Sequence, residues 1–214
     1  MPVRPRIFAD REDGGRRLAG ELRDRDWTDP VVLGLARGGV PVAAVVARRL
    51  GAELDVAVAR KIGAPGHREF GVGAVTPHGP AIYDAAALRT LDLTPARMAR
   101  TETRERAEAR RRLERYRAGR TPAVLTHRDV LLVDDGLATG GTATAAVRDL
   151  RAARPRTLVF AAPVAAPGAV TRMRHEADDV VCVAEPPDFR AVGQWYADFR
   201  QLEDDDVLAL LGPG

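Results

Sequence analysis

The stretch from Val130 to Thr142 reads V-L-L-V-D-D-G-L-A-T-G-G-T, and it decides the fold that we expect for this chain. Its opening V-L-L-V is a short apolar run, which is typical of a parallel strand covered on both faces. Asp134 and Asp135 follow at the carboxyl end of that strand, which is where open α/β sheets bind their ligands. Two neighbouring carboxylates at such a position accept hydrogen bonds from vicinal hydroxyls or attract a divalent cation.

The second half of the stretch is made of small residues and suits an anion. Gly140 and Gly141 lack a β-carbon, so the backbone can turn sharply and bring its N–H groups close to a bound anion. Thr139 and Thr142 add hydroxyl donors. The run at 142–153 reads as a helix, whose positive N-terminal end would point at the same place. The sequence therefore indicates a phosphate site at this turn.

An isolated D-D pair beside a glycine turn is usually a helix cap and a loop, so the specificity lies in the whole stretch. A Walker phosphate loop does not fit, because its lysine is missing and the acidic pair precedes the glycines. The stretch resembles the 5-phosphoribosyl-1-pyrophosphate (PRPP) signature of the type I phosphoribosyltransferases, and D-D-x-L-A-T-G-G-T is most similar to the adenine phosphoribosyltransferases. The resemblance implies that Asp134 and Asp135 hold the ribose hydroxyls. The residues implied for the 5′-phosphate are Ala138, Thr139, Gly140, Gly141 and Thr142.

A second strand-and-glycine motif lies upstream. The apolar run from Val31 to Leu35 leads into Ala36-Arg37-Gly38-Gly39 and then into a helix-like segment. Arg37 is able to clamp phosphate oxygens with its planar fork while the glycine amides approach the same group. Without the downstream signature, a tight βα turn with a surface arginine would be the simpler interpretation. In the resembled family a loop of this kind binds pyrophosphate, so the resemblance implies that role for Arg37, Gly38 and Gly39.

The third motif, Arg60-Lys61, follows a predicted strand from Leu54 to Ala59. Lys61 is the only lysine in the chain, and the other 32 of the 33 basic residues are arginine. Chance placement is the alternative, but adenine and orotate phosphoribosyltransferases have similar residues before a mobile active-site loop. The resemblance therefore implies that Arg60 and Lys61 act on the pyrophosphate leaving group. Glu69, in the segment 63–73 that we expect to be mobile, is the candidate for a catalytic proton acceptor, with an ordinary surface glutamate as the alternative.

Length and composition predict one α/β domain. The 214 residues are 45% hydrophobic, enough to bury a core, and we expect a single domain over 1–214 with its core at about 28–184. Cys182 is the only cysteine and lies in an apolar run, so we interpret it as a core residue rather than a nucleophile. The sequence has no signal-peptide core and no apolar run long enough to span a membrane, which predicts a cytoplasmic protein without membrane partners.

Strand-like and helix-like segments alternate along the chain, which predicts a parallel twisted sheet flanked by helices. Between Gly71 and Asp84, turn residues separate V-G-A-V-T from A-I-Y, as expected for a hairpin. The predicted strands lie near 31–35, 54–59, 130–134, 157–162 and 179–183, and the predicted helices near 10–24, 40–50, 95–118, 142–153 and 167–174.

The segment from Pro95 to Arg120 contains ten arginines and four glutamates, and it supplies the excess behind a net charge of +3. Thr94 and Pro95 favour a helix start, Gly119 favours a helix end, and pairs such as Glu102 with Arg106 have favourable spacing. We predict an inserted long helix that is a lid, a dimer contact or a solvated arm. Nucleic-acid binding is the alternative, but no aromatic interleaving, zinc spacing or helix-turn-helix pattern accompanies the charge, so we expect no nucleic-acid partner.

The C-terminal segment 186–202 holds four of the ten aromatic residues and differs from the sheet repeats. It resembles the P-D-x-F-V-V-G segment of the 6-oxopurine phosphoribosyltransferases. In that family a small hood near the chain ends receives the acceptor base, so we expect a hood at about 185–202 together with the N-terminal segment. The resemblance implies acceptor contacts from Phe189, Val192 and Trp195, with simple packing of the rings as the alternative.

The hood departs from the 6-oxopurine pattern in ways that leave the acceptor open. Arg190 stands where the family has a stacking aromatic residue, and Asp198 is one place late for the acidic residue near pyrophosphate. The run from Leu158 to Val164 lacks the lysine that reads a 6-oxo group, and Ala138 replaces the aspartate that acts on the acceptor proton.

The resemblance implies a Mg2+-dependent transfer of 5-phosphoribose from PRPP to a nucleobase-like or other heterocyclic acceptor, with release of pyrophosphate. The Mg2+ cofactor is expected to be held mainly by PRPP, with Asp134 and Asp135 as the protein groups placed to reach it. The alternatives are a PRPP-sensing regulator that binds nucleic acid, and an enzyme that uses water or an unusual acceptor from specialised metabolism. Related enzymes are commonly dimers, so a homodimer is expected by analogy.

Overall fold

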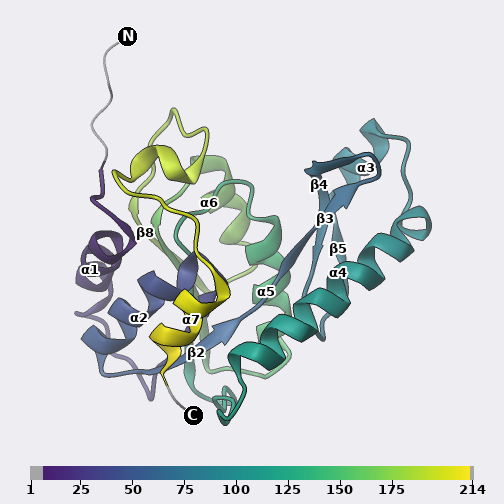
Figure 1. Cartoon of the computed structure of the whole chain (residues 1–214). Helices are drawn as coiled ribbons and strands as arrows, with labels where there is room; N and C mark the ends of the chain where they lie inside the picture. Colours follow the sequence, from purple (N-terminus) through teal and green to yellow (C-terminus); the bar gives the residue numbers. More distant parts are fainter. Residues whose placement is uncertain (1–6, 213–214) are drawn as a thin grey trace.

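The structure, a computed structural model, describes residues 7–212 apart from the side chains of Arg68 and Glu69. Its centre is a five-stranded parallel sheet with the strand order β2-β1-β6-β7-β8 (Figure 1). The strands are β1 (Val31–Leu35), β2 (Glu53–Ala57), β6 (Asp129–Val133), β7 (Thr157–Val164) and β8 (Asp179–Ala184). The predicted parallel α/β sheet is confirmed. Strands β1 and β6, which carry two of the three motifs, are neighbours in it.

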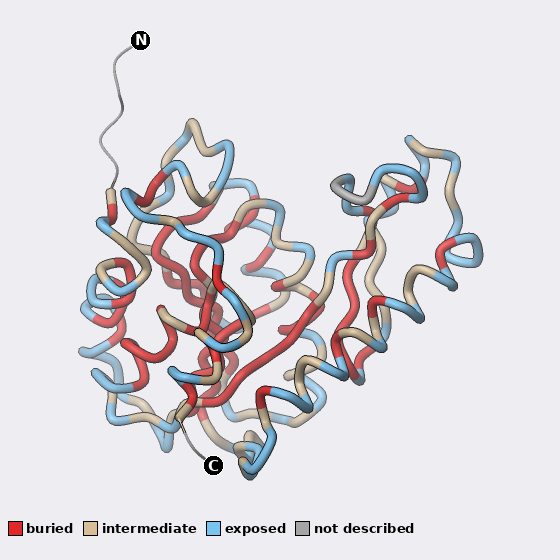
Figure 2. The backbone as a smooth tube through the Cα atoms, in the orientation of Figure 1, coloured by how far each residue is buried: buried red, intermediate tan, exposed pale blue. Residues whose placement is uncertain are grey.

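Helices cover both faces of this sheet, as its continuous apolar strands require. Successive residues of β6 alternate between the faces. Leu131 and Val133 pack with the helices α1 (Arg11–Leu22) and α2 (Gly39–Leu50). Val130 and Leu132 pack with α5 (Gly141–Arg151) and α6 (Pro167–Met173) on the other face. Figure 2 shows that the buried backbone is concentrated in these central strands.

A second, antiparallel sheet of three strands projects from the main sheet (Figure 1). It contains β3 (Arg60–Ala64), β4 (His67–Val75) and β5 (Ile82–Tyr83), and the short helix α3 (Ala85–Thr90) follows it. The hairpin expected between Gly71 and Asp84 is confirmed as β4 and β5. The segment 63–73, which we expect to be mobile, lies in the β3–β4 hairpin. The strand predicted at 54–59 ends at Ala57, because the chain leaves the main sheet there and enters β3.

The long charged helix is α4 (Pro95–Tyr116), and it packs against both sheets. Met98 packs with Ile62 of the small sheet, and Tyr116 packs with Val56 of β2. A helix that the sequence analysis missed, α7 (Asp204–Leu211), covers the same end of α4. The available signal was the run of three aspartates in its first turn, since carboxylates suit the positive end of a helix.

The hood contains the 3-10 helix η1 (Val192–Trp195), and the start of the chain joins it. The N–H of Phe8 donates to the carbonyl of Trp195 at 3.0 Å, and the carbonyl of Phe8 accepts from Ala197 at 2.8 Å. Phe8, Trp195 and Tyr196 form a buried cluster with Val164 of β7. Within residues 7–212, no helix has both the length and the apolar character needed to cross a membrane.

Replacement of Gly34 by alanine is expected to destabilise the fold. A β-carbon at this position of β1 would lie 2.6 Å from the Cα of Val40, and backbone atoms of α2 cannot move away without disturbing the helix. We expect the free energy of unfolding to fall by roughly 1–3 kcal/mol in urea denaturation. Gly20→Ala on α1 is the control, since a β-carbon there meets nothing within 4 Å. Equal stability of the two variants would contradict the close packing of β1 against α2.

Candidate functional site

The predicted phosphate loop joins the end of β6 to the start of α5. Leu137 anchors this loop to the main sheet, because its N–H donates to the carbonyl of Val164 at 2.9 Å and its carbonyl accepts from Ala166 at 2.8 Å. Gly140 has φ +81° and is the N-cap of α5, a conformation that favours glycine. The loop thus ends at the positive end of a helix, which is a suitable place for an anion.

The loop after β1 packs directly against the acidic end of β6. A β-carbon on Gly38 would overlap the carboxylate of Asp135, and one on Gly39 would overlap the carbonyl of Val133. The neighbouring strands therefore bring two of the predicted motifs together, and the two glycines permit that approach.

Asp134 and Asp135 differ in their surroundings. The side chain of Asp135 is 12% exposed, and its Oδ2 accepts a hydrogen bond from Nε of Arg11 at 2.8 Å. Burial raises the pKa of Asp134 well above its ordinary value, and the neighbouring charge of Asp135 raises it further. Burial also raises the pKa of Asp135, but the guanidinium of Arg11 opposes that rise. Asp134 is therefore the member of the pair that takes up a proton more readily.

Arg37 and Arg60, which were predicted to bind pyrophosphate, are both held by carboxylates. The peptide bond between Ala36 and Arg37 is cis. Nη1 of Arg37 donates to Oε2 of Glu203 at 3.2 Å. Arg60 donates through Nε and Nη2 to Oε2 of Glu105 on α4, at 3.0 and 2.7 Å. An anion that binds either guanidinium group therefore competes with the carboxylate that already holds it.

Lys61 lies beside the predicted phosphate loop. A cavity of about 700 Å³ separates the small sheet from the start of α5, and both Lys61 and residues 139–142 line it. Arg172 of α6 lines the same cavity and donates to the carbonyl of Thr139 at 3.3 Å. The other ionisable lining residues, which the sequence analysis also missed, are Tyr83, Asp84, His175 and Glu176. The lining does not include the acid pair, Arg37 or Arg60, so these predicted site residues lie outside this cavity.

The three residues expected to contact an acceptor lie together in the hood. Trp195 is 5% exposed, and its ring centroid lies 6.3 Å from that of the half-buried Phe189. Val192 packs over Gly136, so the hood reaches the acidic strand end. Among the described residues, the buried Nε1 of Trp195 has no hydrogen-bond partner. The side chain of Glu69, the candidate proton acceptor, lies outside the described residues.

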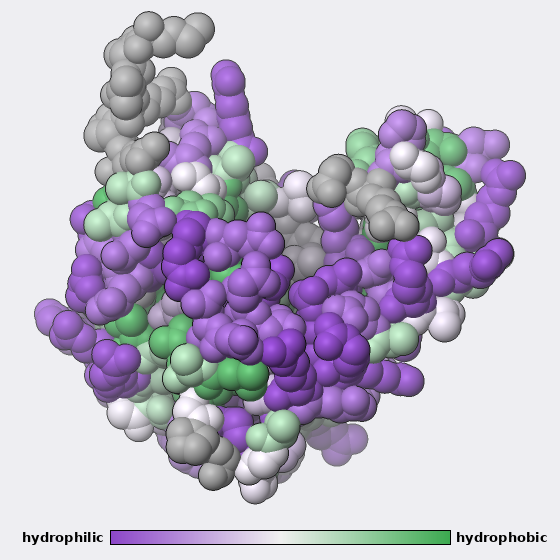
Figure 3. Space-filling view, viewed as in Figure 1, coloured by the Kyte–Doolittle hydropathy of each residue, from purple (hydrophilic) through white to green (hydrophobic). Residues whose placement is uncertain are grey.

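The arginines of α4 are largely engaged within the protein. Arg106 and Arg110 donate to backbone carbonyls of the turn at 76–79, and Arg117, directly after α4, pairs with the buried Asp55 of β2 at 2.8 Å. The helix therefore braces the two sheets against each other and is not a solvated arm. Figure 3 shows that the solvent-facing side of this region stays hydrophilic.

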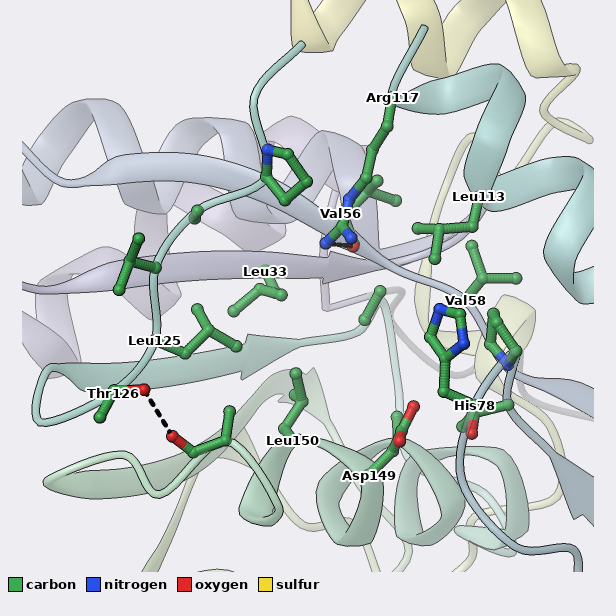
Figure 4. A pocket seen from close by; sticks show the side chains of 18 residues that line it. Leu33, Val56, Val58, His78, Leu113, Arg117, Leu125, Thr126, Asp149 and Leu150 are labelled. Carbon is green, nitrogen blue, oxygen red and sulfur yellow. Dashed lines mark hydrogen bonds between the residues drawn. The ribbon is translucent and has the colours of Figure 1, made fainter.

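A second cavity, of about 330 Å³, lies between the main sheet, α5 and the loop at 122–126 (Figure 4). Apolar side chains such as Leu33, Val56 and Leu150 line it, with His78 and Asp149 as polar neighbours. No residue predicted for function belongs to its lining. We therefore place the candidate site at the carboxyl ends of β1 and β6 rather than in this cavity.

A parallel sheet with an acidic strand end and a glycine loop at a helix start is an arrangement with which α/β proteins bind anionic ligands at the carboxyl ends of their strands. The sequence profile described as the phosphoribosyl transferase domain matches residues 7–200, so the chain belongs to the phosphoribosyl transferase family. The resemblance based on the three motifs is thereby confirmed at the level of the family.

Proteins from two strains of Mycobacterium tuberculosis, provisionally named phosphoribosyl transferases, are 44% identical to this chain over 206 residues. The match covers 96% of this chain and 46% of each relative, so the chain spans about half the length of these curated relatives. A crystal structure of a Thermus thermophilus protein is similar at 47% identity with a TM-score of 0.80, covering 95% of this chain and 97% of that one. A Neisseria gonorrhoeae protein at 13% identity, with a TM-score of 0.51 and coverage of 96% and 94%, shares the fold alone.

Asp134→Asn is expected to stabilise the unliganded protein. Because Asp134 is an acid with a raised pKa, its ionisation lowers stability as the pH rises from the ordinary aspartate range through the raised value. Asparagine carries no charge, so near pH 8 the free energy of unfolding should exceed that of the wild type. The difference should shrink as the pH falls and vanish below the ordinary aspartate range, where Asp134 is protonated in both the folded and the unfolded protein. The exposed Asp26, changed to asparagine, is the control, and an Asp134→Asn variant that loses stability near pH 8 would contradict this burial cost.

Proposed function

We propose that this domain transfers 5-phosphoribose from PRPP to a nitrogen heterocycle or a similar nucleophile, with release of pyrophosphate in a Mg2+-dependent reaction. The observation that carries the proposal is the contact between the glycine loop after β1 and the acid pair after β6. In this arrangement one substrate can meet a carboxylate pair, a cationic loop and a helix start together. Membership of the family supports the same class of reaction.

In this proposal Asp134 and Asp135 hold the ribose hydroxyls, and the loop from Ala138 to Thr142 holds the 5′-phosphate. The phosphate is remote from the reacting carbon, so its binding energy serves to orient the sugar. Fixing the anomeric carbon relative to the acceptor removes much of the entropic cost of the reaction. Arg172 contacts the same loop, which supports it as an additional cation beside the phosphate.

The departure of pyrophosphate builds positive charge on the ribose and negative charge on the leaving oxygens, and both need stabilisation at once. Arg37 with the amides of Gly38 and Gly39, together with Arg60 and Lys61, neutralises the leaving group. The hydrogen-bond partner of Arg37, Glu203, is 71% exposed, so this ion pair is weak and exchanges readily. Arg37 also lies 3.9 Å from a carboxylate oxygen of Asp204, which is 13% exposed. The partner of Arg60 is 12% exposed, so Arg60 is the less readily released of the two arginines.

The acid pair suits a divalent cation that is held mainly by the phosphate oxygens of PRPP. Within the described residues, no group of three or more His, Cys, Asp or Glu side chains is placed to hold a metal ion. Mg2+ commonly takes one or two carboxylates together with phosphate oxygens and water, and Asp134 and Asp135 supply that number. When bound, the ion would neutralise part of the charge on the departing pyrophosphate.

The hood is the proposed acceptor side of the site. Phe189 and Val192 are its more accessible members, whereas Trp195 needs to leave its packed position before its ring can stack on a base. Glu69 stays the proposed proton acceptor. The single domain with its core at about 28–184, the cytoplasmic location and the homodimer are proposed as well, the last by analogy with related enzymes.

The regulatory alternative requires an exposed nucleic-acid surface. The arginine-rich helix was its basis, but Arg106, Arg110 and Arg117 are committed to contacts inside the protein. This observation favours the enzymatic function. Hydrolysis and an unusual acceptor have no specific observation in their favour and are treated as outcomes of the assay.

Titration with PRPP and Mg2+, followed by a screen of purines, pyrimidines and other heterocycles for pyrophosphate release, tests the proposed function. We expect Mg2+-dependent binding of PRPP and release that needs one class of acceptor. Release without an acceptor would indicate hydrolysis. Binding without turnover, together with retention of a nucleic acid, would indicate the regulator. Absence of any affinity for PRPP would refute the proposal altogether.

Lys61→Ala separates the leaving-group site from the phosphate anchor. Loss of one cation beside developing negative charge is expected to lower the rate of pyrophosphate release by about 100-fold. The affinity for ribose 5-phosphate should be unchanged, because this compound lacks pyrophosphate and the loop at α5 stays intact. Arg100→Ala removes a cation of α4 that lies outside the candidate site and serves as the control. If both variants turn over at the wild-type rate, Lys61 has no role at the leaving group.

A further inference from the structure

Arg11 has a largely buried side chain, and it has no role in the reaction proposed above. It is the first residue of α1, and the N-cap Asp10 accepts a hydrogen bond from the N–H of Asp13 at 2.7 Å. A capped helix start is rigid, so it fixes the point from which the Arg11 side chain leaves the backbone. The side chain of Arg11 is 11% exposed, and its charge is therefore largely withdrawn from water.

The guanidinium group of Arg11 joins the acid pair to the hood. Its Nε donates to Oδ2 of Asp135 at 2.8 Å, and its Nη1 donates to the carbonyl of Arg200 at 2.9 Å. Its central carbon also lies 3.9 Å from the centroid of the Phe199 ring. One rigid planar group makes all three contacts, which is an arrangement that lysine cannot reproduce.

The hood also contacts Asp135 directly, through Tyr196. Phe199 stacks on Tyr196 with ring centroids 5.1 Å apart, and Oη of Tyr196 donates to the backbone carbonyl of Asp135 at 2.6 Å. Gly193 confines Phe199, because a β-carbon at Gly193 would lie 2.8 Å from that ring. Asp135, Arg11, Phe199 and Tyr196 thus form a closed chain of contacts, so Asp135 contacts the hood both through Arg11 and directly through Tyr196.

The Arg11 pair differs from the surface pairs of the same helix. Arg16 pairs with Glu12 at 3.1 Å, but their side chains are 43% and 65% exposed, so that pair contributes little. In the pair of Arg11 with Asp135 both side chains are about nine-tenths buried, and removal of either partner would leave an uncompensated charge. Asp135 is also confined on its other side by Gly38. Its orientation therefore depends on Arg11.

We propose that Arg11 is a positioning residue that holds Asp135 in the orientation needed for the ribose hydroxyls and couples this carboxylate to the hood. The inference rests on the proposed function, because it concerns the sugar site of that reaction. Arg11 acts through Asp135 and does not touch the reacting atoms. If Arg11 has this role, occupation of the sugar site and the position of the hood depend on each other.

Binding of ribose 5-phosphate tests the first part of this inference. The probe carries the ribose hydroxyls and the 5′-phosphate, and it requires no acceptor. In calorimetric titration, Arg11→Met should bind it about tenfold more weakly or worse, because a charge-assisted hydrogen bond to the positioned carboxylate is lost. Arg11→Lys keeps the charge and should recover part of the affinity. Arg16→Met is the matched control and should bind like the wild type.

Fluorescence of Trp195 tests the coupling to the hood. In a Trp27→Phe background Trp195 is the only tryptophan, and it lies inside the hood. Saturating ribose 5-phosphate should change its emission when Arg11 is present and change it less in both Arg11→Met and Arg11→Lys, because only the direct bond of Tyr196 to Asp135 then remains. Phe199→Leu should also reduce the emission change while it preserves the affinity for ribose 5-phosphate, because the pair of Arg11 with Asp135 remains.

The outcomes separate the positioning role from the proposed function. A wild-type protein that binds neither PRPP nor ribose 5-phosphate would refute the proposed function and this inference together. If the wild type binds but Arg11→Met binds equally well, or if the emission change is undiminished without Arg11, the positioning role alone is refuted. If circular dichroism shows that Arg11→Met is unfolded, Arg11→Lys and Phe199→Leu decide the question, because a purely structural role predicts that both retain the full emission change.

Discussion

The site depends on the close approach of the two loops that follow β1 and β6. These strands are neighbours in a parallel sheet, so their carboxyl ends meet at the same edge. Gly38 and Gly39 leave no room for a β-carbon between this edge and the first loop. Any larger residue would push the loops apart and separate the cationic turn from the acid pair. The absence of two side chains is therefore as important for this site as the charges that surround it.

Charges at the site are stabilised by partners on elements outside the signature. Asp135 is held by Arg11 of α1, Arg37 by a carboxylate that precedes α7, and Arg60 by Glu105 of α4. A charge withdrawn from water is costly unless an opposite charge accompanies it, so Arg11 and Arg60 offset the burial of their carboxylate partners, whereas the exposed pair of Arg37 contributes little. The same pairs set a cost that an incoming substrate must offset. Helices remote from the phosphate loop thus take part in defining what the site binds.

The arginine-rich helix illustrates how composition can mislead about location. Its charge density resembles that of a solvated arm or a nucleic-acid surface, yet several of its arginines satisfy backbone carbonyls or a buried aspartate. A guanidinium group has five donors, so it can satisfy several acceptors where two sheets meet at an irregular junction. The cap residues and the spacing of the charges predicted the helix itself, with Pro95 at its start. They contained no information on which acceptors would surround it.

Short-range patterns in the sequence determined the strands, the turns and the family, because each depends on residues that are adjacent in the chain. The apolar run before Asp134 defines a buried strand, and the freedom of Gly140 defines the turn that starts α5. The tertiary structure alone decided which charges meet. Arg11 and Asp135 are separated by 124 residues, and their contact depends on the strand order and on the closure of the hood. No local pattern encodes such a pairing, because it arises only when distant elements pack around a common core.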